Sequence, residues 1–277
     1  MSKGFELLLF TIDPALAREA VASGVGGIVI DWEHIGKQDR QSSANTQINR
    51  DTVEDLARMR SSTASRIICR INSYGPETED EIEQAIAAGA DELLMPMVRT
   101  TEEVMDVLDQ TRGRCRIGIL IETVAALHIL EGLAGLPLAR AYVGLNDLAI
   151  ERGTQNIFTA LVDGTVERIR DAFDVPFGFG GLTLPERGSP VPCRLLIGEM
   201  ARLGCSFSFL RRSFIRDMRG RSLSLEVPNL LHALDEAVRR GASERERDRR
   251  ELEFAVNAWP ETLASLKEFS PDEQPAR

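Results

Sequence analysis

Two carboxylates, Glu122 and Asp147, each follow an apolar run that is typical of a buried strand, IGILI and AYVGLN respectively. If these strands are neighbours in a sheet, their ends lie about 5 Å apart. Two carboxylates at that distance repel each other unless a proton or a cation lies between them. Magnesium suits such a pair because it takes one or two protein carboxylates and leaves its other positions to water and substrate oxygens. We therefore predict a Mg²⁺ site; an ordinary charge pair, such as Glu122 with Arg70, is the alternative.

Arg70 and His34 follow two other predicted strands. The planar guanidinium of Arg70 suits a carboxylate or an enolate oxygen, and a salt bridge to Asp31 or Glu33 is the alternative. His34 has the side chain of a general base that works near neutral pH; a loop histidine without a role is the alternative. His128 and His232 lie within helical patterns and are interpreted as structural.

The remaining candidates also lie at or near strand ends, where a parallel barrel collects its active-site groups. We assign Asp31 and Glu33, with His34 and Arg70, to catalysis. We assign Arg70, Trp32, Lys37, Arg40, Asn72, Asn146, Gly180 and Arg212 to substrate binding.

Lysine is scarce, and this bears on mechanism. Lys3, Lys37 and Lys267 are the three lysines, and none lies in a predicted strand. A Schiff-base aldolase needs a lysine that projects into the barrel. If the chain cleaves carbon–carbon bonds, metal-stabilised enolate chemistry is therefore favoured.

Eight short apolar runs alternate with helical patterns, and they must position these groups. The predicted strands are 5–11, 27–33, 66–72, 92–98, 116–123, 140–147, 176–183 and 206–214. The predicted helices between and after them are 13–23, 51–60, 77–88, 101–110, 124–133, 159–173, 192–203 and 222–240. Continuous apolar strands are typical of parallel sheets buried on both faces, so this order predicts a (β/α)₈ TIM barrel.

An open doubly wound sheet is the alternative fold. It would need a glycine-rich phosphate loop after its first strand, and this strand ends in TIDPA without glycine. The glycine cluster FGFGG lies within a late strand instead.

We place the catalytic barrel in residues 1–241 and an extra C-terminal helical segment in residues 242–277. Ser243 and Glu246 have the spacing of a capping box. Leu252, Ala255, Trp259, Leu263 and Leu266 follow at helical spacing, with a break at Pro260. The apolar face of this segment packs either on its own barrel or on another subunit.

The net charge of −10 argues against nonspecific binding of nucleic acid, which needs a basic surface. No apolar run reaches the length of a membrane span, and the N-terminal FELLLFT is interpreted as a strand rather than a signal peptide. The four cysteines form no CxxC pair, so reduced thiols and a cytoplasmic location are expected.

Five segments in order resemble the HpcH/HpaI aldolase and citrate lyase β-subunit family: DWEH at 31–34, RIN at 70–72, GADELLMPMV at 89–98, IET at 121–123 and GLNDLAI at 144–150. The resemblance covers most of residues 5–215. It implies a barrel related to the pyruvate-binding barrels, often hexameric with a swapped C-terminal helix. It also implies Mg²⁺ or Mn²⁺ on Glu122 and Asp147, with Arg70 on the pyruvate carboxylate or enolate.

His34 matches the histidine of the pyruvate aldolase branch, which takes part in proton transfer, whereas the citrate lyase branch usually lacks it. Trp32 departs from that branch, which has glycine there. Residues 36–49 also depart, and Lys37 and Arg40 within them are expected to contact a charged or hydroxylated distal part of the substrate. Arg211 and Arg212 raise the same possibility.

The resemblance thus implies a metal-dependent lyase that cleaves or forms a 4-hydroxy-2-oxo acid through a pyruvate enolate. His34, directly or through a metal-bound water, is expected to remove the proton of the distal hydroxyl. A CoA-thioester lyase of the citrate lyase β or malyl-CoA type is one alternative, and a noncatalytic ligand-binding barrel is the other. A small oxo-acid substrate and a homo-oligomer, a trimer or a hexamer, are the expected partners.

Overall fold

The computed structural model describes residues 4–35 and 51–258. Eight parallel strands form one sheet in the order β7-β6-β5-β4-β3-β2-β1-β8. The strands are β1 (Glu6–Phe10), β2 (Gly27–Asp31), β3 (Arg66–Arg70), β4 (Glu92–Met95), β5 (Arg116–Ile121), β6 (Arg140–Val143), β7 (Phe177–Phe179) and β8 (Phe207–Leu210). Apart from β8, which pairs with β1, the order follows the chain, as a (β/α)₈ barrel requires.

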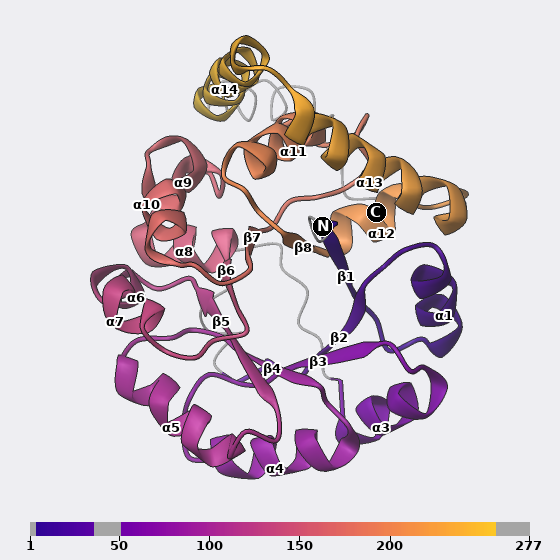
Figure 1. The fold of residues 1–277 in the computed structure, drawn as a ribbon, viewed down its shortest axis with the longest axis vertical. Coiled ribbons are helices and arrows are strands. Elements are labelled where there is room, and N and C mark those ends of the chain that lie inside the picture. The colour runs from indigo at the N-terminus through magenta and orange to yellow at the C-terminus, as the bar shows by residue number, and fades with distance from the viewer. Residues whose placement is uncertain (1–3, 36–50, 259–277) are drawn as a thin grey trace, which may run out of the picture.

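The helices of the described residues surround the strands (Figure 1). They are α1 (Pro14–Ala22), α3 (Val53–Ser62), α4 (Thr78–Ala88), α5 (Thr101–Thr111), α6 (Val124–His128), α7 (Leu130–Ala134), α8 (Leu145–Arg152), α9 (Thr159–Val162), α10 (Thr165–Ala172), α11 (Cys193–Arg202), α12 (Arg212–Asp217), α13 (Leu223–Arg239) and α14 (Ala242–Asn257). The predicted (β/α)₈ barrel is confirmed.

The barrel nearly closes between β7 and β8. The amide of Ser206 donates to the carbonyl of Phe177 at 2.9 Å, and the hydroxyl of Ser208 donates to the carbonyl of Phe179 at 2.7 Å. A Cβ on Gly178 would lie 2.0 Å from the carbonyl oxygen of Phe207. Glycine in FGFGG therefore allows the two backbones to approach and serves closure of the barrel.

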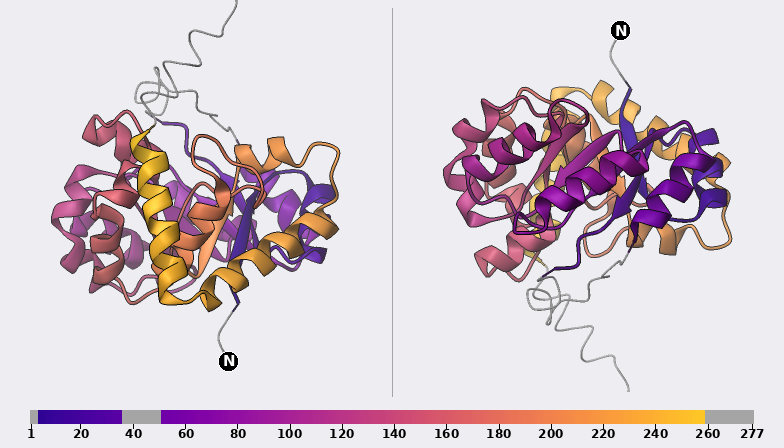
Figure 2. Two further views of the ribbon diagram at one scale, coloured as in Figure 1. Left: turned by 90° about the horizontal axis from the view of Figure 1, so that it is seen from above. Right: turned by 90° about the horizontal axis from the view of Figure 1, so that it is seen from below.

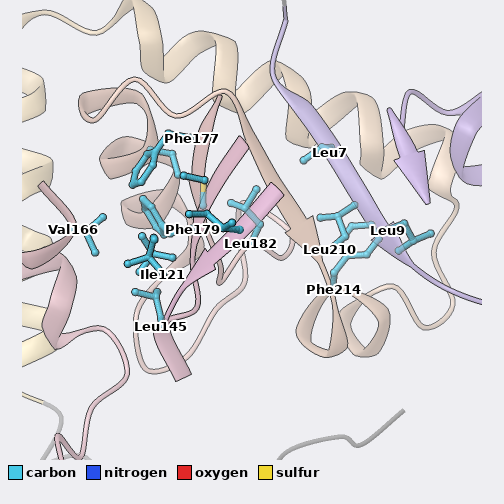
Figure 3. Close-up of a cluster of buried hydrophobic side chains, with 14 of the residues drawn as sticks. Leu7, Leu9, Ile121, Leu145, Val166, Phe177, Phe179, Leu182, Leu210 and Phe214 are labelled. Carbon is cyan, nitrogen blue, oxygen red and sulfur yellow. The ribbon is translucent and has the colours of Figure 1, made fainter. Parts of the chain in front are cut away.

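Alternation along each strand divides the core into two layers. In β1, Leu7 and Leu9 pack outward against the helices, while Leu8 belongs to the separate cluster inside the barrel. Figure 3 shows part of the outer layer, where Phe177 and Phe179 of β7 lie near Ile121 and Leu182. This packing holds the strand ends, and hence the groups that follow them, in fixed positions.

The strands end earlier than the sequence pattern predicts. β6 stops at Val143, and α8 begins two residues later, so Asn146 and Asp147 lie in the first turn of a helix rather than on a strand. The predicted helices 124–133 and 159–173 are each two helices. The apolar pattern continues through these turns because they are buried too, and periodicity alone does not separate the two cases.

The C-terminal helix α14 packs on the barrel of its own chain, against α11 and α9, and Figure 2 shows it along the outer wall. Leu252 and Val256 are its buried residues, and the amide of Asn156 donates to the carbonyl of Val256 at 2.9 Å. The predicted capping box is wrong: Glu244, rather than Glu246, accepts from a cap amide, that of Gly241. Trp259, Leu263 and Leu266 lie outside the described residues.

Among the described residues, none of the helices combines the length and the apolar character needed to cross a membrane.

Candidate active site

A cavity of about 590 Å³ opens at the carboxyl ends of the strands. Its size is in the usual range for a small-molecule site. Six predicted site residues line it: Arg70, Glu122, Asn146, Asp147, Gly180 and Arg212. They come from the ends of β3, β5 and β7, from the first turn of α8 and from the start of α12. The fold thus brings together groups that are up to 142 residues apart in the sequence, from Arg70 to Arg212.

The acidic end of the cavity consists of Glu122 and Asp147. β5 and β6 are hydrogen-bonded neighbours, as the sequence argument assumed. Glu122 is 1% exposed and Asp147 is 8% exposed. Burial raises the pKa of Glu122 to about 8, and the nearby charges of Asp147 and Glu33 act in the same direction. The protein therefore holds two carboxylates where their combined negative charge is unfavourable.

The backbone around Glu122 is shaped to hold its carboxylate. The amide of Met97 donates to Oε1 of Glu122 at 2.9 Å, and Met97 has a φ of 53°, a left-handed conformation that is uncommon outside glycine. On the other side, a Cβ on Gly144 would lie 1.9 Å from Oε2 of Glu122. Gly144 leaves the space that this carboxylate occupies.

This arrangement fits a divalent cation that uses few protein ligands. No group of three or more His, Cys, Asp or Glu side chains that could hold a metal occurs in residues 4–35 and 51–258. Two nearby carboxylates that line the same cavity are nevertheless enough for Mg²⁺ or Mn²⁺, because water and substrate oxygens complete the coordination. A cation between them would also relieve the repulsion that raises the pKa of Glu122.

Arg70 forms the salt bridges that the sequence left open as an alternative. Its Nε and Nη2 donate to the two oxygens of Asp31 at 2.8 and 2.7 Å, and its Nη1 lies 2.9 Å from Glu33. Asp31 stands opposite Arg70 in the β2–β3 register. Both carboxylates are fully buried, and neither lines the cavity. The structure therefore places Asp31 and Glu33 where they fix the guanidinium of Arg70 at the cavity wall.

His34 and Asn72 form a turn beside the cavity rather than part of its wall. The side-chain oxygen of Asn72 accepts from the amides of His34 and Ile35 at 2.9 and 2.8 Å. Nδ1 of His34 lies 2.7 Å from the carbonyl oxygen of Trp32. Since a carbonyl only accepts, Nδ1 donates this hydrogen bond, and in the neutral imidazole the lone pair is then on Nε2.

Trp32 belongs to the outer core, and its indole nitrogen has no hydrogen-bond partner among the described residues. It does not line the cavity. Lys37 and Arg40 lie outside the described residues.

Sequence reasoning missed several residues that line the cavity. Tyr142 and Phe209 line it with rings whose centroids are 4.2 Å apart and whose planes are tilted by 39°. Arg216 and Arg219 were also missed and line it as well; Arg211, which the sequence indicated as a possible substrate contact, lines it too, and its Cζ lies 4.4 Å from the ring centre of Phe10. The available signal was the run RRSFIRDMR directly after β8, which holds four arginines in nine residues.

Comparisons with solved structures agree with this fold. An HpcH/HpaI aldolase from Desulfitobacterium hafniense DCB-2 matches with a TM-score of 0.58 and 14% identity over 79% of this chain and 90% of that one. Citrate synthase SbnG matches with a TM-score of 0.58 and 19% identity over 82% and 93%. RipC from Yersinia pestis matches with a TM-score of 0.56 and 17% identity over 88% and 99%.

At these identities the structural likeness shows the fold alone. None of the curated proteins matches the chain. The family model of HpcH/HpaI aldolase/citrate lyase matches residues 7–156, which include Arg70, Glu122 and Asp147. Because this match spans more than half of the 277 residues, the chain belongs to the HpcH/HpaI aldolase/citrate lyase family, which supports an enzyme of the lyase or aldolase kind.

Proposed function

We propose that the protein is a divalent-metal-dependent carbon–carbon lyase that cleaves or forms a 4-hydroxy-2-oxo acid through a pyruvate enolate. The observation that carries this proposal is the meeting of Glu122, Asp147 and Arg70 on one cavity. Two carboxylates suit a cation, and a fixed guanidinium suits the negative charge of an oxo-acid. A noncatalytic binding barrel has no need to bury two adjacent carboxylates at an energetic cost.

Glu122 and Asp147 would hold Mg²⁺ or Mn²⁺. When bound, the cation supplies positive charge that polarises the oxo-acid oxygens and favours the enolate. The amide of Met97 and the space left by Gly144 hold the Glu122 carboxylate in one position for this purpose. Precise placement matters because electrostatic stabilisation depends on groups that are already oriented before reaction.

Arg70 would bind the carboxylate or the enolate oxygen of the pyruvate unit. Its guanidinium is held by Asp31 and Glu33, so little conformational entropy is lost when the substrate binds. Arginine also keeps its charge here, because the two carboxylates raise its pKa further above the ordinary value. The group is therefore a cation near neutral pH.

His34 is our candidate for the group that moves the proton of the distal hydroxyl, directly or through water. In the neutral imidazole Nε2 carries the lone pair, and the hydrogen bonds that the amides of His34 and Ile35 donate to Asn72 hold the turn in place. Removal of this proton leaves an alkoxide whose electrons form the carbonyl of the released aldehyde as the C3–C4 bond breaks. The bonding electrons pass to the pyruvate fragment as its enolate.

The test is an assay of retro-aldol cleavage of a 4-hydroxy-2-oxo acid, in which the release of pyruvate is measured. EDTA should abolish activity, and added Mg²⁺ or Mn²⁺ should restore it. Glu122→Gln should lower kcat/KM by about 100-fold or more, as expected for loss of a charge that acts in the transition state. Glu83→Gln, a change at an exposed helix position, is the charge-matched control. Full activity in EDTA, or in Glu122→Gln, would refute the metal assignment.

A further inference from the structure

Four arginines at the carboxyl end of β8 line two adjoining cavities. Arg211, Arg212, Arg216 and Arg219 contribute to the cavity that holds Glu122 and to a second one of about 360 Å³. Phe10 is shared by both. The four arginines lie outside residues 7–156, so the family match does not account for them. A chain with a net charge of −10 has thus gathered cations at one side of its active-site mouth.

The described lining of the second cavity is cationic. Among the described residues that line the second cavity there is no Asp or Glu. Arg216 pairs with Asp217 at 2.9 Å, and Nη2 of Arg211 lies 3.4 Å from Asp31, which already accepts two hydrogen bonds from Arg70. Burial and the charge of Arg70 lower the pKa of Arg211. An anionic ligand would therefore relieve unfavourable charge at this place.

We propose that the arginines after β8 bind a phosphate group on the distal part of the substrate, so that the partner released from the pyruvate unit is a phosphorylated aldehyde. This inference rests on the proposed function. It concerns the part of the cavity lining that follows β8, whereas the oxo-acid is assigned to Glu122, Asp147 and Arg70. The pyrophosphate of a CoA thioester is the other source of the same chemistry.

A phosphate fits this cluster better than a carboxylate does. A phosphate monoester carries close to two negative charges near neutral pH and three acceptor oxygens, so it can use several guanidinium groups at once. A single carboxylate is satisfied by one bidentate arginine. The loops after the seventh and eighth strands are also the place where (β/α)₈ barrels frequently bind phosphate.

The test compares wild-type protein with the double variant Arg216→Gln/Arg219→Gln. The rate of aldol addition of pyruvate is measured with three aldehydes: glyceraldehyde 3-phosphate, succinic semialdehyde and glyceraldehyde. Cleavage of malyl-CoA is measured in parallel. Binding of glycerol 3-phosphate is measured by calorimetry. Arg114→Gln is the control, since Arg114 is exposed and precedes β5, at the opposite end of the barrel. The single variant Arg219→Gln provides a milder change.

We expect the wild type to prefer the phosphorylated aldehyde. Each lost arginine should lower kcat/KM for that substrate by about 10-fold, as expected for a hydrogen bond between charged groups. Turnover of glyceraldehyde should change by less than about 3-fold, because a neutral aldehyde makes no such bond. Glycerol 3-phosphate should bind to wild type and to Arg114→Gln but not to the double variant.

The outcomes separate the two proposals. Equal loss with the phosphorylated and neutral aldehydes, a preference for succinic semialdehyde, or glycerol 3-phosphate binding unaffected by the variants would overturn the phosphate site. Arginine-dependent cleavage of malyl-CoA would support the site with CoA as its source. Arginine-dependent binding of glycerol 3-phosphate without turnover of any substrate would support the site and refute the proposed function.

Discussion

Replacement of Gly144 by alanine tests whether the position of the Glu122 carboxylate governs activity. The new Cβ would lie 1.9 Å from Oε2 of Glu122 and 2.8 Å from its Cβ. To reach a contact of about 3.5 Å, the carboxylate oxygen must move by about 1.5 Å. Gly144 has φ −81° and ψ 81°, with φ in the range that alanine also adopts, so the main effect is this collision.

The displaced carboxylate should impair metal binding and catalysis more than folding. A shift of about 1 Å in a catalytic group can lower the rate about 100-fold, whereas overpacking of a buried site costs about 1–3 kcal/mol. We therefore expect Gly144→Ala to lose about 100-fold in kcat/KM for retro-aldol cleavage. Its affinity for Mn²⁺, measured by calorimetry, should fall in parallel.

Gly135→Ala is the matched control, because the same added Cβ meets its nearest atoms at 3.6 and 3.7 Å. It should keep wild-type activity and Mn²⁺ affinity. Thermal unfolding of both variants separates loss of the site from loss of the fold. If folded Gly144→Ala binds Mn²⁺ and cleaves substrate as the wild type does, the assignment of Glu122 as a placed metal ligand is wrong.

Two further changes test stability. Arg140→Met removes the main partner of the fully buried Glu92 at the amino end of the barrel, where Nη2 of Arg140 lies 3.1 Å from Oε2 of Glu92. We expect the free energy of unfolding, measured in urea, to fall by about 3–5 kcal/mol. An unchanged midpoint of urea unfolding would contradict this role of Arg140. Asp51 accepts from the amide of Asp31 at 2.8 Å, and burial raises its pKa to about 6. The folded state disfavours the charged form of Asp51, so ionisation of this carboxyl destabilises the fold. The effect is absent below about pH 4, grows between about pH 4 and 6 and is complete above about pH 6. Asp51→Asn should therefore raise the unfolding temperature at pH 7 but not at pH 4. The gain in stability at pH 7 should be about 1 kcal/mol or less, because the carboxyl is partly exposed. An equal rise in the unfolding temperature at both pH values would refute this explanation.

The sequence predicted the barrel because its signals are local and repeated. Continuous apolar runs such as IGILI require burial on both faces, and their alternation with helical patterns leaves few architectures. It also indicated Glu122, Asp147 and Arg70, because charged residues that follow buried strands gather at the carboxyl end of a barrel. Element ends were less predictable, as the start of α8 at Leu145 shows.

What the sequence determined by itself is the order of the elements and the chemical types at their ends. Tertiary structure decided which of those groups meet. The pairing of Arg70 with both Asp31 and Glu33 depends on strand register and side-chain direction. The position of Trp32 depends on its packing in the outer core, and that of His34 on the turn that Asn72 holds. The arginines after β8 show the same limit, because only closure of the barrel brings residues 211–219 beside Phe10 of β1. Charge and hydrophobic pattern are properties of neighbours along the chain, whereas a site is a property of neighbours in space.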